Sequence, residues 1–177
     1  LLVGQSNRRV QQLFASPHSA GSVAIGMAEG TRSIDGGKTP YWTSHTDPGN
    51  QKRNQGTFSN QVDGKTAEEA DELQLERVRK FAEKIAGQAP ELTELELVAG
   101  ADLYNQAPKA AATYLEKLAE AKKKGLSGEE AIVEARVKSF IAPNGKLDAP
   151  GLRNDLEFVK FDQGRRVEEI DKGLKRN

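Results

Sequence analysis

Three Ser/Thr-x-x-Glu spacings, each opening a run of apolar residues at helical period, dominate the chain after residue 65. The pairs are Thr66 with Glu69, Thr93 with Glu96 and Ser127 with Glu130. This spacing is that of a capping box, in which both side chains bond backbone groups at a helix start. Apolar residues then recur every three or four positions, as on the buried face of a helix. The pattern predicts three helices that continue through Ile85, Leu103 and Phe140.

Four more helices are expected outside these three, over residues 7–14, 17–29, 108–124 and 155–174. Ser16-Pro17 reads as an N-cap followed by proline at the first helical position. Gly30 is a typical C-terminal stop, so Glu29 closes a largely apolar helix at its last turn. Pro143 to Gly145 predicts a break.

The helical period disappears between residues 31 and 65, where Gly, Asn, Thr, Ser, Gln and Asp predominate. So long an irregular stretch in a compact domain is commonly functional or contains short strands. We expect a hairpin formed near Tyr41–His45 and Thr57–Ser59, with a turn over residues 47–50. The predicted fold is a mainly α, α+β domain that covers residues 1–177, with a small irregular lobe at about 31–62.

Charge and composition limit the partners. The 26 basic residues balance 26 acidic ones, so the chain has no net charge that would attract it to nucleic acid or an anionic membrane. There are 177 residues, enough for one core, and no apolar run long enough to span a membrane. The absence of cysteine and the presence of two histidines make a metal site unexpected, and no cofactor is predicted.

Glu29 is the best candidate for chemistry. A carboxylic acid at the end of an apolar helix, facing a polar loop, is placed where it can keep its proton and donate it. Glycoside cleavage usually needs a second acidic group across the bond, and Asp35 and Asp47 are the carboxylates of the loop before Asp63. The alternatives are a solvated Glu29 and aspartates that only build turns.

The run Ala28-Glu29-Gly30-Thr31 resembles the Ser-Glu-Gly-Thr run of lambda-type phage lysozymes. In that family the glutamate closes the first helix and is the catalytic acid, and a small sheet region and a helical lobe follow. Gly56-Thr57-Phe58-Ser59 is a loose analogue of the family's Gly-aromatic-Gln element. The resemblance implies a lysozyme-like fold with Glu29 as the acid.

A wider set of motifs resembles a group of bacterial, chiefly cyanobacterial, proteins. The motifs are residues 29–32, 45–50, 56–59, 105–108 and 149–152. This second resemblance spans most of the chain. It implies a fold and a site location but no reaction.

Nine residues are candidates for substrate contact. They are Arg32, Tyr41, Trp42, His45, Asn50, Thr57, Ser59, Asn105 and Gln106. The aromatic rings could stack on sugars or cover the core, and the two amides at a helix end could bind an N-acetyl group or act as a cap. Arg32 could pair with Glu29 or Asp47, and pairing with Glu29 would favour the ionised form and oppose acid catalysis. His45 and Asp47 are two ligands without a third, which favours a turn hydrogen bond over a metal.

Two functional hypotheses follow. The first is a glycoside hydrolase or lytic transglycosylase that acts on peptidoglycan or a related aminosugar polymer, monomeric and extracytoplasmic, with a polysaccharide as its partner. The second is a non-catalytic glycan- or protein-binding module on the same scaffold. The first requires a partly buried Glu29 in a groove, with a second carboxylate across it.

Overall fold

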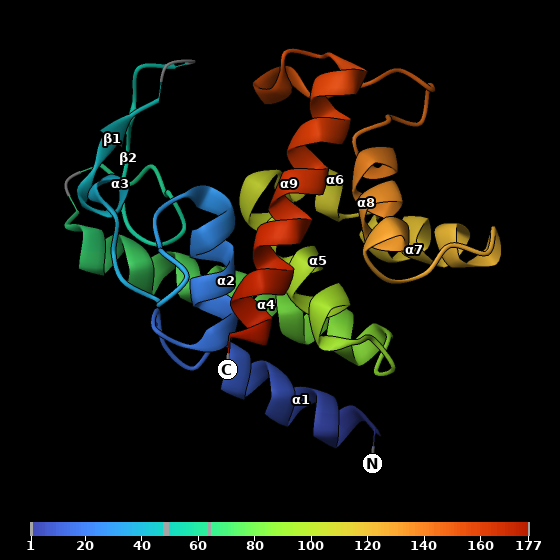
Figure 1. The fold of residues 1–177 in the computed structure, drawn as a ribbon, viewed down its shortest axis with the longest axis horizontal. Helices are drawn as coiled ribbons and strands as arrows, with labels where there is room; N and C mark the ends of the chain where they lie inside the picture. Colours follow the sequence, from blue (N-terminus) through green and yellow to red (C-terminus); the bar gives the residue numbers. More distant parts are fainter. Residues whose placement is uncertain (1, 48–49, 64, 177) are drawn as a thin grey trace.

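The computed structural model describes residues 2–47, 50–63 and 65–176. Helices dominate this part of the chain (Figure 1). They are α1 (Leu2–Leu13), α2 (Ala20–Glu29), α3 (Pro40–Thr43), α4 (Ala67–Gln88), α5 (Glu94–Gln106), α6 (Pro108–Ala111), α7 (Tyr114–Lys123), α8 (Gly128–Ser139), the 3-10 turn η1 (Pro150–Leu152) and α9 (Leu156–Lys175). Two short strands, β1 (His45–Thr46) and β2 (Arg53–Asn54), complete the fold.

One continuous apolar core joins the helices, with α5 near its centre. Helix α5 packs against α2, α4, α6, α8 and α9, and it contributes the fully buried Leu97 and Leu103. Ile25 of α2, Ile132 of α8 and Ile170 of α9 belong to the same buried cluster. Burial of these aliphatic side chains is the main driving force that fixes the helices around α5.

Helices α2 and α9 make the most extensive contact between elements. At Gly173 an added Cβ would lie 3.0 Å from the sulfur of Met27 and 3.1 Å from Cα of Ala24. Small residues on both helices therefore allow a close approach of their backbones. This contact places the C-terminal end of α2, and with it Glu29, beside the middle of α9.

The predicted helix starts are mostly confirmed. Thr66 and Thr93 both form complete capping boxes with the glutamate three residues later. Ser127 is the N-cap of α8, but its side chain makes no capping hydrogen bond, so the expected third box does not form. Asp155 caps α9 by accepting a hydrogen bond from the backbone of Phe158 at 3.2 Å.

Two helix boundaries differ from prediction. Helix α2 begins at Ala20 instead of at Pro17, because Ser16 and Ser19 close a turn through hydrogen bonds of 2.9 and 3.1 Å. The helix expected over residues 108–124 breaks at residues 112–113 into α6 and α7. Tyr114, buried at the start of α7, donates its hydroxyl to the carbonyl of Glu96 at 2.7 Å, and this contact redirects the chain.

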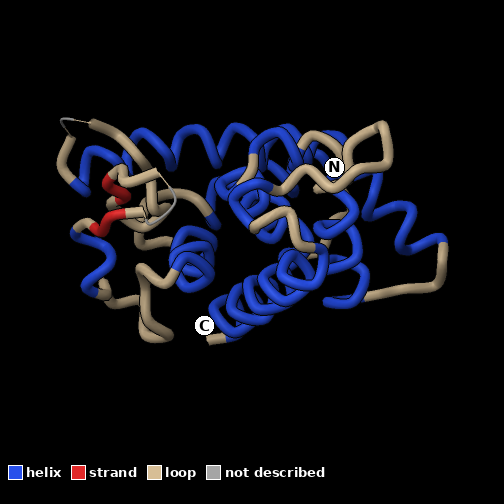
Figure 2. The backbone as a smooth tube through the Cα atoms, turned by 90° about the horizontal axis from the view of Figure 1, so that it is seen from above, coloured by secondary structure: helices blue, strands red, loops and turns tan. Residues whose placement is uncertain are grey.

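The lobe formed by residues 31–63 gathers the strands and most of the long loops at one end of the molecule (Figure 2). Strands β1 and β2 pair antiparallel, with His45 opposite Asn54 and Thr46 opposite Arg53. The expected hairpin partners were wrong: Tyr41 lies in α3, and residues 57–59 form a turn closed by an isolated bridge between Gln55 and Asn60. The mainly α, α+β class is confirmed.

The turn expected over residues 47–50 includes Pro48 and Gly49, which lie outside the described residues. On its flanks the backbone of Asp47 bonds the carbonyl of Lys52 at 2.8 Å, and Gln51 bonds the carbonyl of Asp47 at 2.8 Å. No helix among the residues described is long and apolar enough to cross a membrane.

Candidate functional site

A cleft of about 910 Å³ lies between the lobe and the helical part. One wall comes from the lobe and one from α6, the end of α8 and the segment up to η1, while Glu29 and Arg166 connect them. The lobe wall contains Asp47, Asn54, Phe58, Ser59, Asn60 and Gln61. The opposite wall is largely apolar and contains Phe140, Ile141, Pro143, Ala149, Pro150 and Leu152, with Lys109 and Asp148 at its edge.

Glu29 reaches the cleft from the last turn of α2. Gly30 follows in the left-handed region with φ 81°, where glycine is favoured, and ends the helix there. The Glu29 side chain is 16% exposed, and its Oε1 accepts hydrogen bonds from Arg166 at 2.7 Å and from Asn105 at 3.0 Å. Among the described residues nothing bonds Oε2, so this oxygen remains for a partner in the cleft.

Arg166 belongs to a buried charge network that continues into the core. Its guanidinium binds both oxygens of Asp102, at 2.8 and 2.9 Å, and Arg136 also reaches Asp102 at 2.8 Å. Burial alone would lower the pKa of Arg166, but Asp102 and Glu29 together raise it above its ordinary value. Arg166 is therefore a permanent cation, held on one side by Asp102 and on the other by Glu29.

The two amides expected near the site do line the cleft, but both are engaged by the protein. Asn105 donates to Glu29 and to the carbonyl of Phe58 at 3.0 Å each, and accepts from Gln74 at 2.9 Å. Gln106 donates to Asp162 at 2.8 Å and accepts from Arg136 and Gln163. Asn105 thus joins Glu29 to the lobe, and neither residue is left as a free sugar-binding amide.

Two other amides in the cleft have unused hydrogen-bonding capacity. Asn54 Oδ1 and Asn60 Nδ2 are buried and have no partner among the described residues. Both residues are half-buried and line the lobe wall. Unsatisfied buried polar atoms are costly and are often found where a ligand binds. Sequence reasoning missed both residues, because Asn is also the commonest kind of residue in turns.

Arg32, Trp42 and Thr57 do not line the cleft, which corrects their assignment as substrate contacts. They are buried at the base of the lobe around Asp71, which is 2% exposed. The Thr57 hydroxyl accepts from Arg32 at 2.9 and 3.1 Å and donates to Asp71 at 2.8 Å. The Trp42 indole donates to Asp71 at 3.2 Å. These residues attach the lobe to α4, and Arg32 pairs with neither Glu29 nor Asp47.

The remaining lobe candidates divide between the cleft and the outer surface. Asp47 and Ser59 line the cleft. His45 lies just behind it: its ring shares hydrogen bonds with Ser59 at 3.3 Å and with the Tyr41 carbonyl at 3.1 Å. Tyr41 is 58% exposed and Asn50 bonds Gln61 at 3.3 Å, and neither lines the cleft.

Asp35 is also placed away from the cleft. It is exposed in a turn, where it accepts from the Ser33 hydroxyl and from the Gly37 backbone. The Ser33 hydrogen bond, followed by that of Gly37, lowers the pKa of Asp35. Asp35 is thus a turn residue, the alternative left open by the two glycines after it. In the cleft, the carboxylates that accompany Glu29 are Asp47 and Asp148.

Residues 2–47, 50–63 and 65–176 contain no group of three His, Asp or Glu side chains placed to hold a metal ion. No protein-family model, curated protein or solved structure matches this chain. The lysozyme-like resemblance therefore stays an expectation, and the cleft itself is the basis for a function.

Proposed function

We propose that the chain is a glycoside hydrolase or lytic transglycosylase that cleaves an aminosugar polymer, with Glu29 as the general acid. The observation that carries the proposal is the hydrogen bonding of the Glu29 carboxyl group. Its Oε1 is fixed by Arg166 and Asn105, and its Oε2 has no partner among the described residues of the cleft. A proton on Oε2 would be oriented toward a bound substrate by the contacts to Oε1.

In the proposed reaction Oε2 donates its proton to the glycosidic oxygen as the bond from that oxygen to the anomeric carbon breaks. Positive charge develops on the sugar ring. Water or a hydroxyl group of the substrate then attacks the anomeric carbon and gives its proton to the Glu29 carboxylate, which restores the acid. Asp47, on the lobe wall of the same cleft, is the carboxylate assigned to stabilise this charge or position the water.

The lobe wall supports an acetamido-bearing substrate. An amide group in the ligand offers one N–H donor and one carbonyl acceptor. Asn54 Oδ1 and Asn60 Nδ2 are an unpaired acceptor and an unpaired donor on the same wall. The apolar opposite wall, with Ile141, Pro143 and Leu152, would pack against the faces of the sugar rings.

A second candidate is a non-catalytic glycan-binding module, and the ion pair of Glu29 with Arg166 favours it. Two buried arginines, Arg136 and Arg166, balance Asp102 and an ionised Glu29, which makes the network neutral. Proton uptake by Glu29 would leave a net positive charge in a buried place. In this alternative Glu29 positions Arg166 and the lobe, and the cleft binds a glycan without cleaving it.

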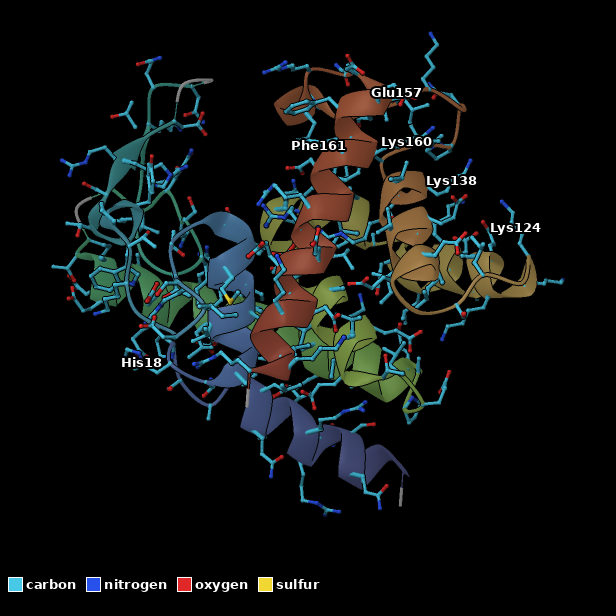
Figure 3. All side chains as sticks on the ribbon, in the orientation of Figure 1. His18, Lys124, Lys138, Glu157, Lys160 and Phe161 are labelled. Carbon is cyan, nitrogen blue, oxygen red and sulfur yellow. The ribbon has the colours of Figure 1, made fainter. Side chains whose placement is uncertain are left out.

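Release of soluble fragments from purified peptidoglycan and from chitin oligomers separates the two candidates. The comparison uses the native chain, Glu29→Gln and the matched control Glu157→Gln. Glu157 is 84% exposed at the start of α9, where it pairs with Lys160 at 3.5 Å (Figure 3). Circular dichroism and binding of the same oligomers are measured on all three proteins.

The catalytic proposal expects cleavage by the native chain and by Glu157→Gln, and a loss of at least about a hundredfold in Glu29→Gln with binding retained. Binding by every variant with no cleavage by the native chain would instead establish the binding module. If the native chain neither binds nor cleaves these glycans, both candidate functions are contradicted.

A further inference from the structure

A second cavity lies far from the cleft, between α1 and the connection from α4 to α5. It has a volume of about 410 Å³ and is lined by Gln5, Ser6, Arg9, Pro90, Glu91 and Leu92. None of these residues lines the larger cleft. Helix α1 lies along the lower edge of the molecule in the view of Figure 1, away from the β1–β2 pair at the upper left. An activity of this cavity is therefore independent of the proposed glycosidase site.

Arg9 is exceptional among the buried guanidinium groups. Its Nε and Nη2 are inaccessible to solvent and have no acceptor among the residues that the structure describes. By contrast, Arg32, Arg136 and Arg166 each have several acceptors within hydrogen-bonding distance. A cationic donor that is removed from water without an acceptor is unfavourable. A ligand that supplied the missing acceptors would remove this penalty.

The surroundings of Arg9 indicate what kind of ligand would fit. The cavity contains one carboxylate, Glu91, and no nitrogen of Arg9 lies within ion-pair distance of it in the described part of the chain. Ser6 already donates its hydroxyl to the carbonyl of Pro90 at 3.0 Å. The exposed Gln5 amide is a further possible donor at the rim. Arg9 therefore lines a cavity that contains a carboxylate, yet its Nε and Nη2 have no acceptor among the described residues.

We propose that this cavity binds a small oxyanion, a phosphate or carboxylate group, through the Arg9 guanidinium with help from Gln5. The planar fork of arginine N–H groups matches the two oxygens of either anion. Pro90 and Leu92 provide an apolar side against which the rest of an organic phosphate or carboxylate would pack. The volume lies within the ordinary range of small-molecule sites, above that needed for the anion alone.

The test measures binding of inorganic phosphate and, in a separate arm, of citrate to the full chain by calorimetry and thermal shift. The variants are Arg9→Gln and the matched control Arg8→Gln, which removes the same charge from the adjacent, exposed position of α1. We expect saturable binding of at least one anion to the native chain, at least about tenfold weaker binding to Arg9→Gln and a change of less than about twofold in Arg8→Gln. The anion that binds more tightly shows whether the cavity prefers a phosphate or a carboxylate group.

Glu91→Gln supplies a test that does not depend on the folding of Arg9→Gln. Removal of the one carboxylate of the cavity is expected to tighten anion binding by about two- to fivefold, because a like charge near the ligand is lost. The proposal is overturned if neither anion binds the native chain, if Arg8→Gln weakens binding as much as Arg9→Gln, or if Glu91→Gln weakens binding. Loss of glycan cleavage in Glu29→Gln would leave all these results unchanged.

Discussion

The helical part of the molecule and the lobe of residues 31–63 are each organised around a buried aspartate, but the two differ in what surrounds it. Asp102 lies on α5, where the guanidinium groups of Arg136 from α8 and Arg166 from α9 bind it within the main core. Asp71 projects from α4 into the lobe, where it accepts from the backbone of Thr57 at 2.6 Å, from the Thr57 hydroxyl and from the Trp42 indole.

This difference predicts unequal stability in the two walls of the cleft. The helices share a continuous core, so the Asp102 network is one of many interactions that must break together. The lobe contributes few buried apolar side chains, chiefly Trp42 and Phe58, and its attachment depends largely on polar contacts, those around Asp71 and the hydrogen bond from Asn105 to the Phe58 carbonyl. Regions with few apolar contacts open with a smaller free energy than the core. The lobe wall of the cleft should therefore open while the helical wall remains folded.

The largest effect is expected from Asp102→Ala. Two buried guanidinium groups would lose their shared carboxylate, and one partner missing from a buried ion pair typically costs about 3–5 kcal/mol. Urea unfolding followed by far-ultraviolet circular dichroism measures this loss. Glu72→Ala, at an exposed position of α4, is the control and should change the free energy of unfolding by less than about 0.5 kcal/mol. A small effect of Asp102→Ala would contradict the central role of the network.

The same substitution has a pH signature. Burial alone would raise the pKa of Asp102, but Arg166 and Arg136 outweigh it and lower the pKa below its ordinary value. A carboxylate with a lowered folded-state pKa stabilises the fold above its unfolded pKa of about 3.9, and this stabilisation is lost as pH falls through the folded-state pKa. The difference in unfolding free energy between native chain and Asp102→Ala should therefore be constant near neutral pH and shrink in acid below about pH 4.

A smaller and local effect is expected from Asp71→Ala. The substitution leaves the Thr57 backbone N–H without its acceptor, takes one of two acceptors from the Trp42 indole and removes the charge that faces Arg32, at a cost of about 1–3 kcal/mol. Hydrogen exchange should show loss of protection across residues 31–62 with α5 and α9 unchanged. Trp42 is the only tryptophan, so its fluorescence reports the lobe directly. Glu72→Ala, the exposed neighbour on α4, is the control, and equal loss of protection in α5 would refute the independence of the lobe.

The helical part was the more predictable region because its signals are local. Capping boxes at Thr66 and Thr93 need residues only three positions apart, and the apolar period is a property of a few turns. One error, the undivided helix over residues 108–124, arose where a distant contact decided the outcome. Tyr114 bonds the carbonyl of Glu96, 18 residues away, and the predicted helix over 108–124 divides there.

Among the predicted residues that line the cleft, Glu29, Asn105 and Gln106 had a local reason to reach it, whereas Asp47 and Ser59 had none. Glu29 lies at a helix end that Gly30 terminates, and Asn105 and Gln106 lie at the end of α5, so all three reach the cleft. The partners of these residues have no local signature: Arg166 is 137 residues from Glu29, and Asn105 is 76 residues from it. Nothing in the order of residues could distinguish a lobe side chain that faces the cleft from one that faces Asp71.

The smallest effects are expected at two helix starts of the helical part. Their sequences are similar, but their capping contacts differ. The Thr93 hydroxyl accepts from the backbone of Glu96 at 3.1 Å, whereas Ser127 makes no side-chain capping bond. Thr93→Ala should lower the free energy of unfolding by about 1 kcal/mol and Ser127→Ala by only a few tenths. Chemical denaturation of both variants measures the difference. Equal losses would mean that the Ser127 cap forms in solution, because the hydroxyl is the capping group removed in each case.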